Sequence, residues 1–195
     1  MAEIVPGART VHVVDETLLA DARTRGEVDD ELRIRLLTRL REAARDADVV
    51  VCTCSTISGA AEAVANQLTV PVIRVDRPMA EHAVACGTRI AVVAALASAV
   101  APTMALLQEV ADHRGVSVRL VGYSCTDAWV LFEQGDNEKY LRAVASVVDS
   151  LPGPVDAIVL AQASMAMAAE VCRTDVAVLS SPRLAVAHAA RTIGT

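Results

Sequence analysis

Residues 48–56 are Asp-Val-Val-Val-Cys-Thr-Cys-Ser-Thr, and residues 156–164 are Asp-Ala-Ile-Val-Leu-Ala-Gln-Ala-Ser. Each stretch begins with an acidic residue, continues as an apolar run and leads into an Ala-rich segment. Short continuous apolar runs are typical of strands that are buried on both faces, as in parallel sheets. Glu62 and Glu170 follow the two stretches at matching positions. The sequence therefore predicts an internal repeat, in which two halves of the chain have similar structures.

Strand-like and helix-like segments alternate along the rest of the chain. Apolar β-branched runs predict strands, and apolar residues spaced three or four apart predict helices. We expect strands at 10–14, 49–52, 71–75, 89–94, 116–121, 155–161 and 176–179. We expect helices at 29–46, 58–68, 79–86, 102–113, 127–150 with a break at 135–136, 164–172 and 182–191. This alternation indicates an α/β protein with parallel sheets flanked by helices.

The repeat divides the predicted fold into two similar lobes. The first lobe is expected to span 1–88 and the second 89–181, with a C-terminal helix at 182–195 that packs back on the first lobe. Ligands of open α/β sheets bind at the carboxyl ends of the strands. The residues after Val51 and after Leu160 should therefore line an active-site cleft between the lobes.

The composition excludes several classes of protein. The 195 residues are 53% hydrophobic, 22% charged and 2% aromatic, which argues against disorder and against an aromatic-rich β-sandwich. The net charge of -6 disfavours a nucleic-acid partner, because phosphate binding requires a basic face. The four aromatic residues, Tyr123, Trp129, Phe132 and Tyr140, could line the mouth of the second lobe, but we expect them to serve core or dimer packing.

The cysteines and the apolar segments indicate a cytoplasmic protein. Five Cys is an odd number, and residues 1–9 contain no apolar run like that of a signal peptide, so we expect free thiols in a reducing compartment. Residues 90–107 are uncharged, but Ser98, Pro102 and Thr103 interrupt them. We interpret this segment as a buried strand, a loop and the start of a helix, and predict no membrane contact.

The candidate site consists of Cys54-Ser55-Thr56 and Gln162-Ala163-Ser164, which follow the two repeated strands. A thiol before a helix N-terminus lies at the positive end of the helix dipole, which favours the thiolate. The hydroxyls and free amides of the first helical turn can hold a carboxylate. Cys54 is therefore a candidate base or nucleophile beside a bound anion.

Other interpretations of the same residues remain open. Cys52 and Cys54 could be small apolar residues of a buried strand. A metal-binding or redox pair is disfavoured because no second Cys/His cluster accompanies it, and we expect no metal. The chain has no Gly-rich phosphate loop, so we expect no nucleotide cofactor. His12 could point into the cleft, although a strand histidine is more often structural.

Several motifs resemble those of the aspartate/glutamate racemase superfamily, which includes hydantoin racemases, maleate isomerases and arylmalonate decarboxylases. Residues 48–56 resemble its Asp-x-x-x-x-x-Cys-Asn-Thr motif. Asp15 occupies the position of the Asp in the N-terminal Asp-Ser-Gly of glutamate racemases. Residues 90–103 resemble the central strand and loop, and residues 122–135 resemble the Ala-Cys-Pro…Glu-x-Gly segment. Gln162 stands where the family has its second catalytic Cys.

The resemblance implies a chemistry for these positions. Family racemases use no cofactor, because one Cys removes the proton next to a carboxylate and the other reprotonates the opposite face. Cys54 corresponds to one of the two acid/base residues. Asp15 and Gln162 correspond to positions that contact the substrate. The remaining substrate-binding positions are Ser55, Thr56, Ala163 and Ser164. Asp15 could equally be a helix cap.

The predicted function is a cofactor-independent, cysteine-dependent isomerase or racemase that acts on a small carboxylate or amino-acid derivative. Gln162 cannot transfer protons, because its amide has no accessible pKa near neutrality. Two alternatives therefore remain: a single-cysteine decarboxylase or lyase of the same superfamily, and a catalytically inactive carboxylate-binding protein. The resemblance also suggests a homodimer.

Overall fold

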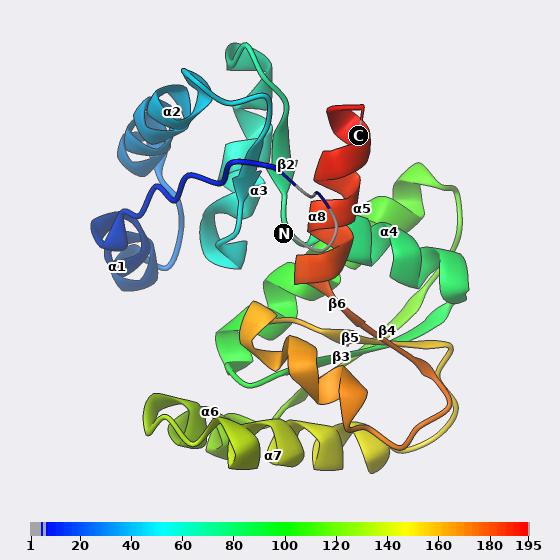
Figure 1. Ribbon diagram of the computed structural model, residues 1–195. Coiled ribbons are helices and arrows are strands. Elements are labelled where there is room, and N and C mark those ends of the chain that lie inside the picture. Colours follow the sequence, from blue (N-terminus) through cyan, green and yellow to red (C-terminus); the bar gives the residue numbers. More distant parts are fainter. Residues whose placement is uncertain (1–4, 6, 195) are drawn as a thin grey trace. The chain divides into compact units, whose positions relative to one another are not determined.

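The computed structural model describes Val5 and residues 7–194, apart from the side chain of Arg23 (Figure 1). The chain forms two compact units. Unit 1 comprises Met1–Val75 and Ala185–Thr195, and unit 2 comprises Asp76–Leu184. The α/β fold with parallel sheets flanked by helices is confirmed in both units. Each unit is described below by itself.

Unit 2 contains a four-stranded parallel sheet in the order β4-β3-β5-β6. Its strands are β3 (Arg89–Ala94), β4 (Arg119–Ser124), β5 (Ala157–Leu160) and β6 (Ala177–Ser180). Helices α4 (Arg77–Cys86) and α5 (Val100–His113) cover one face. The other face carries α6 (Thr126–Glu133), α7 (Asn137–Asp149) and the 3₁₀ helix η3 (Ala163–Glu170), as Figure 1 shows.

Alternation along β3 explains why helices cover both faces of this sheet. Ile90, Val92 and Ala94 lie in the core with α4 and α5. Ala91 and Val93 belong to the core on the opposite face. Successive side chains of a strand point to opposite faces, so an unbroken apolar strand needs cover on both. The predicted strands at 89–94 and 155–161 are confirmed for this reason.

Asp156 fixes the amino-terminal end of this sheet. Its Oδ2 accepts hydrogen bonds from the amides of Thr88 and Arg89 at 3.0 and 2.9 Å, and its Oδ1 accepts from the Arg89 guanidinium. These bonds lower the pKa of Asp156 to about 2. A Cβ at Gly87 would lie 2.5 Å from that of Asp156, so only glycine permits this approach. Asp156 thus joins the start of β3 to that of β5.

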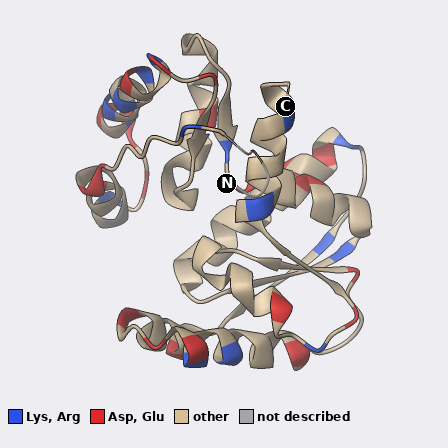
Figure 2. Cartoon of the chain, viewed as in Figure 1, with Lys and Arg blue, Asp and Glu red and all other residues tan. Residues whose placement is uncertain are grey.

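Unit 1 has a smaller sheet, in which β1 (Val50–Cys52) and β2 (Val72–Arg74) pair in parallel. Helices α1 (Glu16–Arg25), α2 (Asp30–Ala44), α3 (Ser55–Ala63) and the 3₁₀ helix η1 (Ala65–Gln67) complete it, with the part of α8 (Ser181–Thr192) from Ala185 onward. Helix α2 buries Leu32, Leu36 and Leu40 against Cys52 and Ala61. Acidic and basic residues lie close together along α2 in Figure 2.

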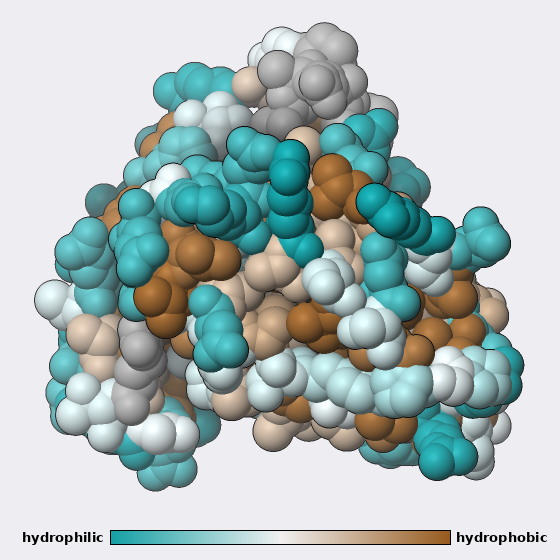
Figure 3. All heavy atoms as spheres, turned by 90° about the horizontal axis from the view of Figure 1, so that it is seen from below, coloured by the Kyte–Doolittle hydropathy of each residue, from teal (hydrophilic) through white to brown (hydrophobic). Residues whose placement is uncertain are grey.

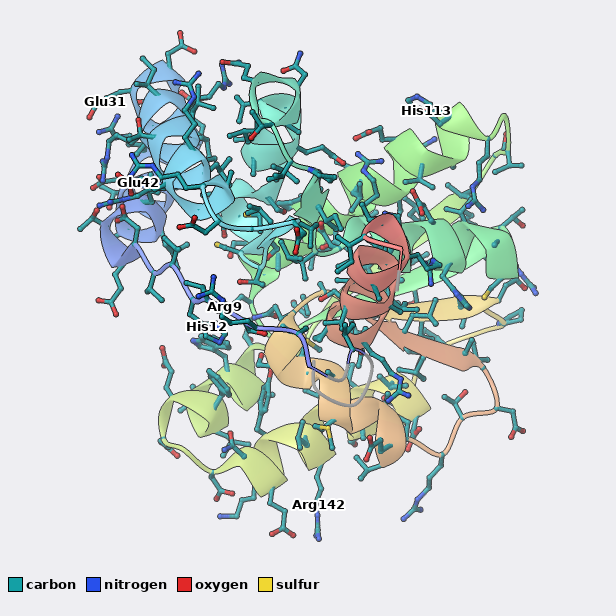
Figure 4. All side chains as sticks on the ribbon, turned by 45° about the horizontal axis from the view of Figure 1, so that its top comes forward. Arg9, His12, Glu31, Glu42, His113 and Arg142 are labelled. Atoms are coloured by element: carbon teal, nitrogen blue, oxygen red, sulfur yellow. The ribbon has the colours of Figure 1, made fainter. Side chains whose placement is uncertain are left out.

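The predicted strand at residues 10–14 is wrong. This segment precedes α1 without entering a sheet, and Val11 and Val14 are 69% and 77% exposed. A β-branched run forms a strand only where it can pair with a neighbouring strand and pack against a core. Residues 10–14 pair with no strand and are exposed. His12 and Arg9 are exposed on the same segment (Figure 4). The helix over 16–25 was not among the predicted helices, although the helix-cap alternative for Asp15 implied a helix that starts there.

Two further predictions differ from the structure. The helix predicted at 164–172 is a 3₁₀ helix at 163–170. The division between the units falls after Val75, whereas the prediction placed it after residue 88. The difference arises because α4 packs against α5 and against Ala157 and Val159 of β5. The predicted helix at 182–195 corresponds to α8, whose residues from Ala185 cluster with unit 1.

Residues 90–107 form β3, a loop, the 3₁₀ helix η2 (Ala97–Ala99) and the start of α5, as predicted. No helix in the described part of the chain has both the length and the apolar character needed to cross a bilayer. Figure 3 shows that apolar side chains on one face lie in separate patches among polar ones.

Candidate active site

Cys54 lies at the junction of β1 and α3. It is the N-cap residue of α3, with an extended backbone, and its carbonyl oxygen accepts the amides of Ser58 and Ile57 at 2.9 and 3.2 Å. The thiol is free and only partly buried, whereas Cys52, two residues earlier, is buried in the core. Residues two apart in a continuous strand share a face, so the difference arises because β1 ends at Cys52 and the chain turns into α3 at Cys54, which is the accessible thiol of this pair.

Ser55 and Thr56 are the first two residues of α3. Their amides have no acceptor within the helix, because the first turn of any helix leaves its N–H groups unpaired. The hydrogen bonds of the described residues include none from these two amides. The start of α3 thus combines a thiol, two hydroxyls and two open amides, a set that can hold an oxygen anion.

Arg74 adds a buried positive charge beside α3. Its side chain is 9% exposed, and its Nη1 lies 3.7 Å from Oε2 of Glu62. A Cβ at Gly59 would lie 3.2 Å from Nη1, so the glycine leaves room for the guanidinium against the helix. Arg74 was not among the predicted site residues. Arginine is rarely buried without a partner, so an arginine at the end of a buried apolar strand could have indicated a buried charge near the site.

Asp15 is engaged as the N-cap of α1. Its Oδ1 accepts the amide of Leu18 at 3.2 Å and the hydroxyl of Thr17 at 2.6 Å, and its Oδ2 accepts Nε of Arg39 at 2.8 Å. The Thr17 hydroxyl and the Arg39 guanidinium hold the pKa of this carboxyl well below its usual range. The helix-cap alternative is thereby confirmed, and a contact with substrate stays a prediction.

Gln162 lies at the carboxyl end of β5 in unit 2. Its Oε1 accepts hydrogen bonds from the amides of Ala95 and Leu96, at 2.7 and 3.0 Å, directly after β3. The residue is the N-cap of η3, and its carbonyl oxygen accepts the amide of Met165 at 3.0 Å. The position that sequence analysis selected thus links the ends of two neighbouring strands. Its partners were missed, because backbone amides carry no residue-type signal.

The two residues after Gln162 have different surroundings. Ala163 is exposed. The Ser164 hydroxyl lies 2.8 Å from that of Tyr140, whose side chain is buried. Burial raises the pKa of Tyr140, so its hydroxyl stays neutral. Phe132 packs against Tyr140 and Trp129, with ring centroids 5.1 and 4.9 Å apart, so these three aromatic residues support the core as expected.

The predicted site residues therefore form two half-sites. The Cys54 half-site, residues 54–56, belongs to unit 1, and the Gln162 half-site, residues 162–164, belongs to unit 2. That both contact one ligand stays a prediction. Within residues 5 and 7–194, no three His, Cys, Asp or Glu side chains lie close enough together to hold a metal ion.

Comparison with known proteins identifies the family. Residues 1–189 match the Asp/Glu/hydantoin racemase family. The chain belongs to this family. A search of curated proteins finds no significant match. The family assignment confirms the resemblance inferred from the motifs around Cys54 and Gln162.

Solved structures of other racemase-family proteins share the fold of this chain. A Yersinia pestis protein assigned as an Asp/Glu racemase aligns with a TM-score of 0.71 and 13% identity, over 100% of this chain and 89% of that one. Bacillus anthracis glutamate racemase RacE1 aligns with a TM-score of 0.59 and 15% identity, over 83% of this chain and 64% of that one. A Gly74Cys variant of arylmalonate decarboxylase aligns with a TM-score of 0.57 and 17% identity, over 85% of this chain and 76% of that one.

The chain also resembles Thermus thermophilus glutamate racemase, with a TM-score of 0.53 and 23% identity over 89% of this chain and 62% of that one. The chain therefore spans less than two thirds of the length of both glutamate racemases. At these identities the structural matches establish the fold that this racemase-family member shares with them.

Proposed function

We propose that this chain is a racemase-family enzyme that transfers a proton at the carbon next to a carboxylate, with Cys54 as the transferring group and no cofactor. The observation that carries the proposal is the position of Cys54. Cys54, whose thiol is partly buried, follows a parallel strand and is the N-cap residue of a nine-residue helix without making a side-chain capping hydrogen bond, in a chain that belongs to a family of racemases.

The surroundings of Cys54 suit this step. The open amides and hydroxyls of Ser55 and Thr56 would hold a carboxylate, and the helix N-terminus stabilises negative charge. The Cys54 thiolate would take the proton from the substrate carbon, and the electron pair would delocalise into the carboxylate oxygens. Return of a proton to the carbon would complete an exchange cycle. The donors near the carboxylate would stabilise the charge that develops.

The substrate class follows from the family and stays coarse. Aspartate, glutamate and hydantoins are the compounds in the family description, and an arylmalonate is the substrate in the name of one structural relative. In a decarboxylation, the bond to the departing CO₂ would break, its electron pair would remain on the carbon, and the Cys54 thiol would supply the proton. Gln162 favours this single-cysteine reaction, because an amide cannot supply a second acid or base.

The test is proton exchange in D₂O, followed by NMR with aspartate, glutamate, a 5-substituted hydantoin and phenylmalonate. A compound that exchanges or loses CO₂ should do so about 10²- to 10⁴-fold more slowly with Cys54→Ser. Cys86→Ser is the matched control, because Cys86 is exposed at the end of α4. Turnover that is unchanged in Cys54→Ser would contradict the proposal.

A catalytically inactive carboxylate-binding protein is the second candidate. It is favoured by the engagement of Gln162 with two backbone amides, at the position where the family resemblance implies a second Cys. Binding of a carboxylate from this panel without any exchange or CO₂ release would select this candidate.

A further inference from the structure

The carboxyl end of the sheet in unit 2 has a feature that the proton-transfer step does not use. The strand order is β4-β3-β5-β6, so the chain runs from β3 to one side and then returns to the other side at β5. The switch in direction lies between β3 and β5. In open α/β sheets, ligands bind in the crevice at such a switch point, beyond the carboxyl ends of the strands.

Gln162 lies at this switch point. The ladder between the two strands ends with Val93 beside Leu160 and with the amide of Ala161 donating to the carbonyl of Val93 at 2.9 Å. Gln162 is the next residue, and its Oε1 accepts the amides of Ala95 and Leu96. Its side-chain oxygen therefore occupies the two backbone donors that a ligand oxygen would otherwise meet there.

The two hydrogen bonds also fix the direction of the amide group. With Oε1 held by two donors, the opposite orientation would place the Nε2 hydrogens against the hydrogens of Ala95 and Leu96. No described residue accepts a hydrogen bond from Nε2. Every buried side-chain nitrogen or oxygen in the described part of the chain has a partner, so Nε2 reaches solvent. Gln162 thus presents a donor of fixed direction.

We propose that Gln162 is the ligand-binding donor of unit 2: the amides of Ala95 and Leu96 clamp its oxygen, and its Nε2 donates to a carboxylate oxygen of the ligand. The proposal deepens the proposed function, on which the choice of a carboxylate rests. It assigns to the position of the family's second Cys a binding role without proton transfer. The ligand must then present an oxygen acceptor at this point.

Gln162→Glu separates the clamp from the donor. The substituted side chain has the same length, and a carboxylate accepts backbone amides at least as well as an amide oxygen. It replaces the NH₂ donor with a second acceptor. We expect the unfolding midpoint of Gln162→Glu at pH 7 to equal or exceed that of the unchanged protein. Gln162→Ala leaves both amides without their acceptor, so its midpoint should fall.

Malonate is the probe, measured by calorimetry with the full chain. Loss of a hydrogen bond to a charged ligand should weaken binding about tenfold or more, and the added negative charge acts in the same direction. Gln162→Glu should therefore bind malonate at least about tenfold more weakly than the unchanged protein. Gln134→Glu, at an exposed position after α6, is the matched control for charge and should bind normally.

The outcomes distinguish this inference from the proposed function. Normal malonate binding by Gln162→Glu would overturn the donor role, and so would the absence of malonate binding by the unchanged protein. A midpoint of Gln162→Glu as low as that of Gln162→Ala would overturn the clamp. Malonate binding that depends on Gln162, in a protein without Cys54-dependent exchange, would refute the proposed function and leave this inference standing.

Discussion

Replacing Asp15 with Ala should destabilise unit 1, because the side chain caps α1 and pairs with a residue of α2. The cap hydrogen bond to the Leu18 amide is worth about 1 kcal/mol. The ion pair with Arg39, whose side chain is 49% exposed, adds about 0.5 kcal/mol. We therefore expect Asp15→Ala to lower the free energy of unfolding by about 1.5 kcal/mol. Asp15→Asn keeps a capping oxygen and should lose only about 0.5 kcal/mol.

Denaturant unfolding followed by circular dichroism measures these differences at pH 7. Asp29→Ala is the matched control: Asp29 caps α2 through the Leu32 amide at 2.9 Å and pairs with Arg25, and it is not a predicted site residue. Both Ala variants should lose similar stability. The pKa of Asp15 is lowered in the folded state, so its contribution is present above its ordinary pKa of 3.8 and is lost as the pH falls further.

The result that would refute this reasoning is an Asp15→Ala variant of unchanged stability that no longer binds a carboxylate. Asp15 would then be a substrate-binding residue, as the family resemblance implies, and its hydrogen bonds to α1 and α2 would contribute little to stability.

Three further predictions concern other positions. Gly122→Ala should lower the free energy of unfolding by about 1–3 kcal/mol, since a Cβ there would lie 2.4 Å from a methyl group of α5; an unchanged denaturation midpoint would contradict this. The stability that Asp156 contributes should be lost as the pH falls from about 4 to 2, and Asp156→Asn should show a shallower acid-unfolding profile there. If Gln162 transfers no proton, Cys54 supplies proton exchange from one face only, so chiral analysis should find deuterium in one enantiomer and equal labelling of both would count against it.

Most strands and helices of unit 2 could be predicted because their packing imposes a local pattern, although β4 lies three residues later than the strand predicted at 116–121. Residues 90–94 and 157–161 are unbroken apolar runs, as strands covered on both faces must be. The break between α6 and α7 was predicted at Gly135, which has a φ of +77°, and Asp136, which caps α7. In each case the signal lies within a few residues of the feature that it predicts.

The errors arise where distant partners decide the outcome. Residues 10–14 have strand propensity, but no neighbouring strand receives them. Helix α1 was missed because its apolar face is weak, with Leu18 and Ala22 as its buried residues. The contact of Gln162 with Ala95 and Leu96 spans more than sixty residues and uses backbone donors. The position of the candidate site could thus be predicted from the strand ends, whereas its hydrogen bonds could not.

Unit 1 is built from two segments that are far apart in the sequence, and this determines the order in which the two units can be completed during synthesis. Met1–Val75 leaves the ribosome first, but its unit also includes Ala185–Thr195, which emerges only after all of Asp76–Leu184. Unit 2 is continuous in sequence and needs no later residue for its own contacts. Closing unit 1 requires contacts between residues more than a hundred positions apart, and such contacts form slowly. Of the two units, the one whose synthesis begins earlier is therefore the one that is completed later.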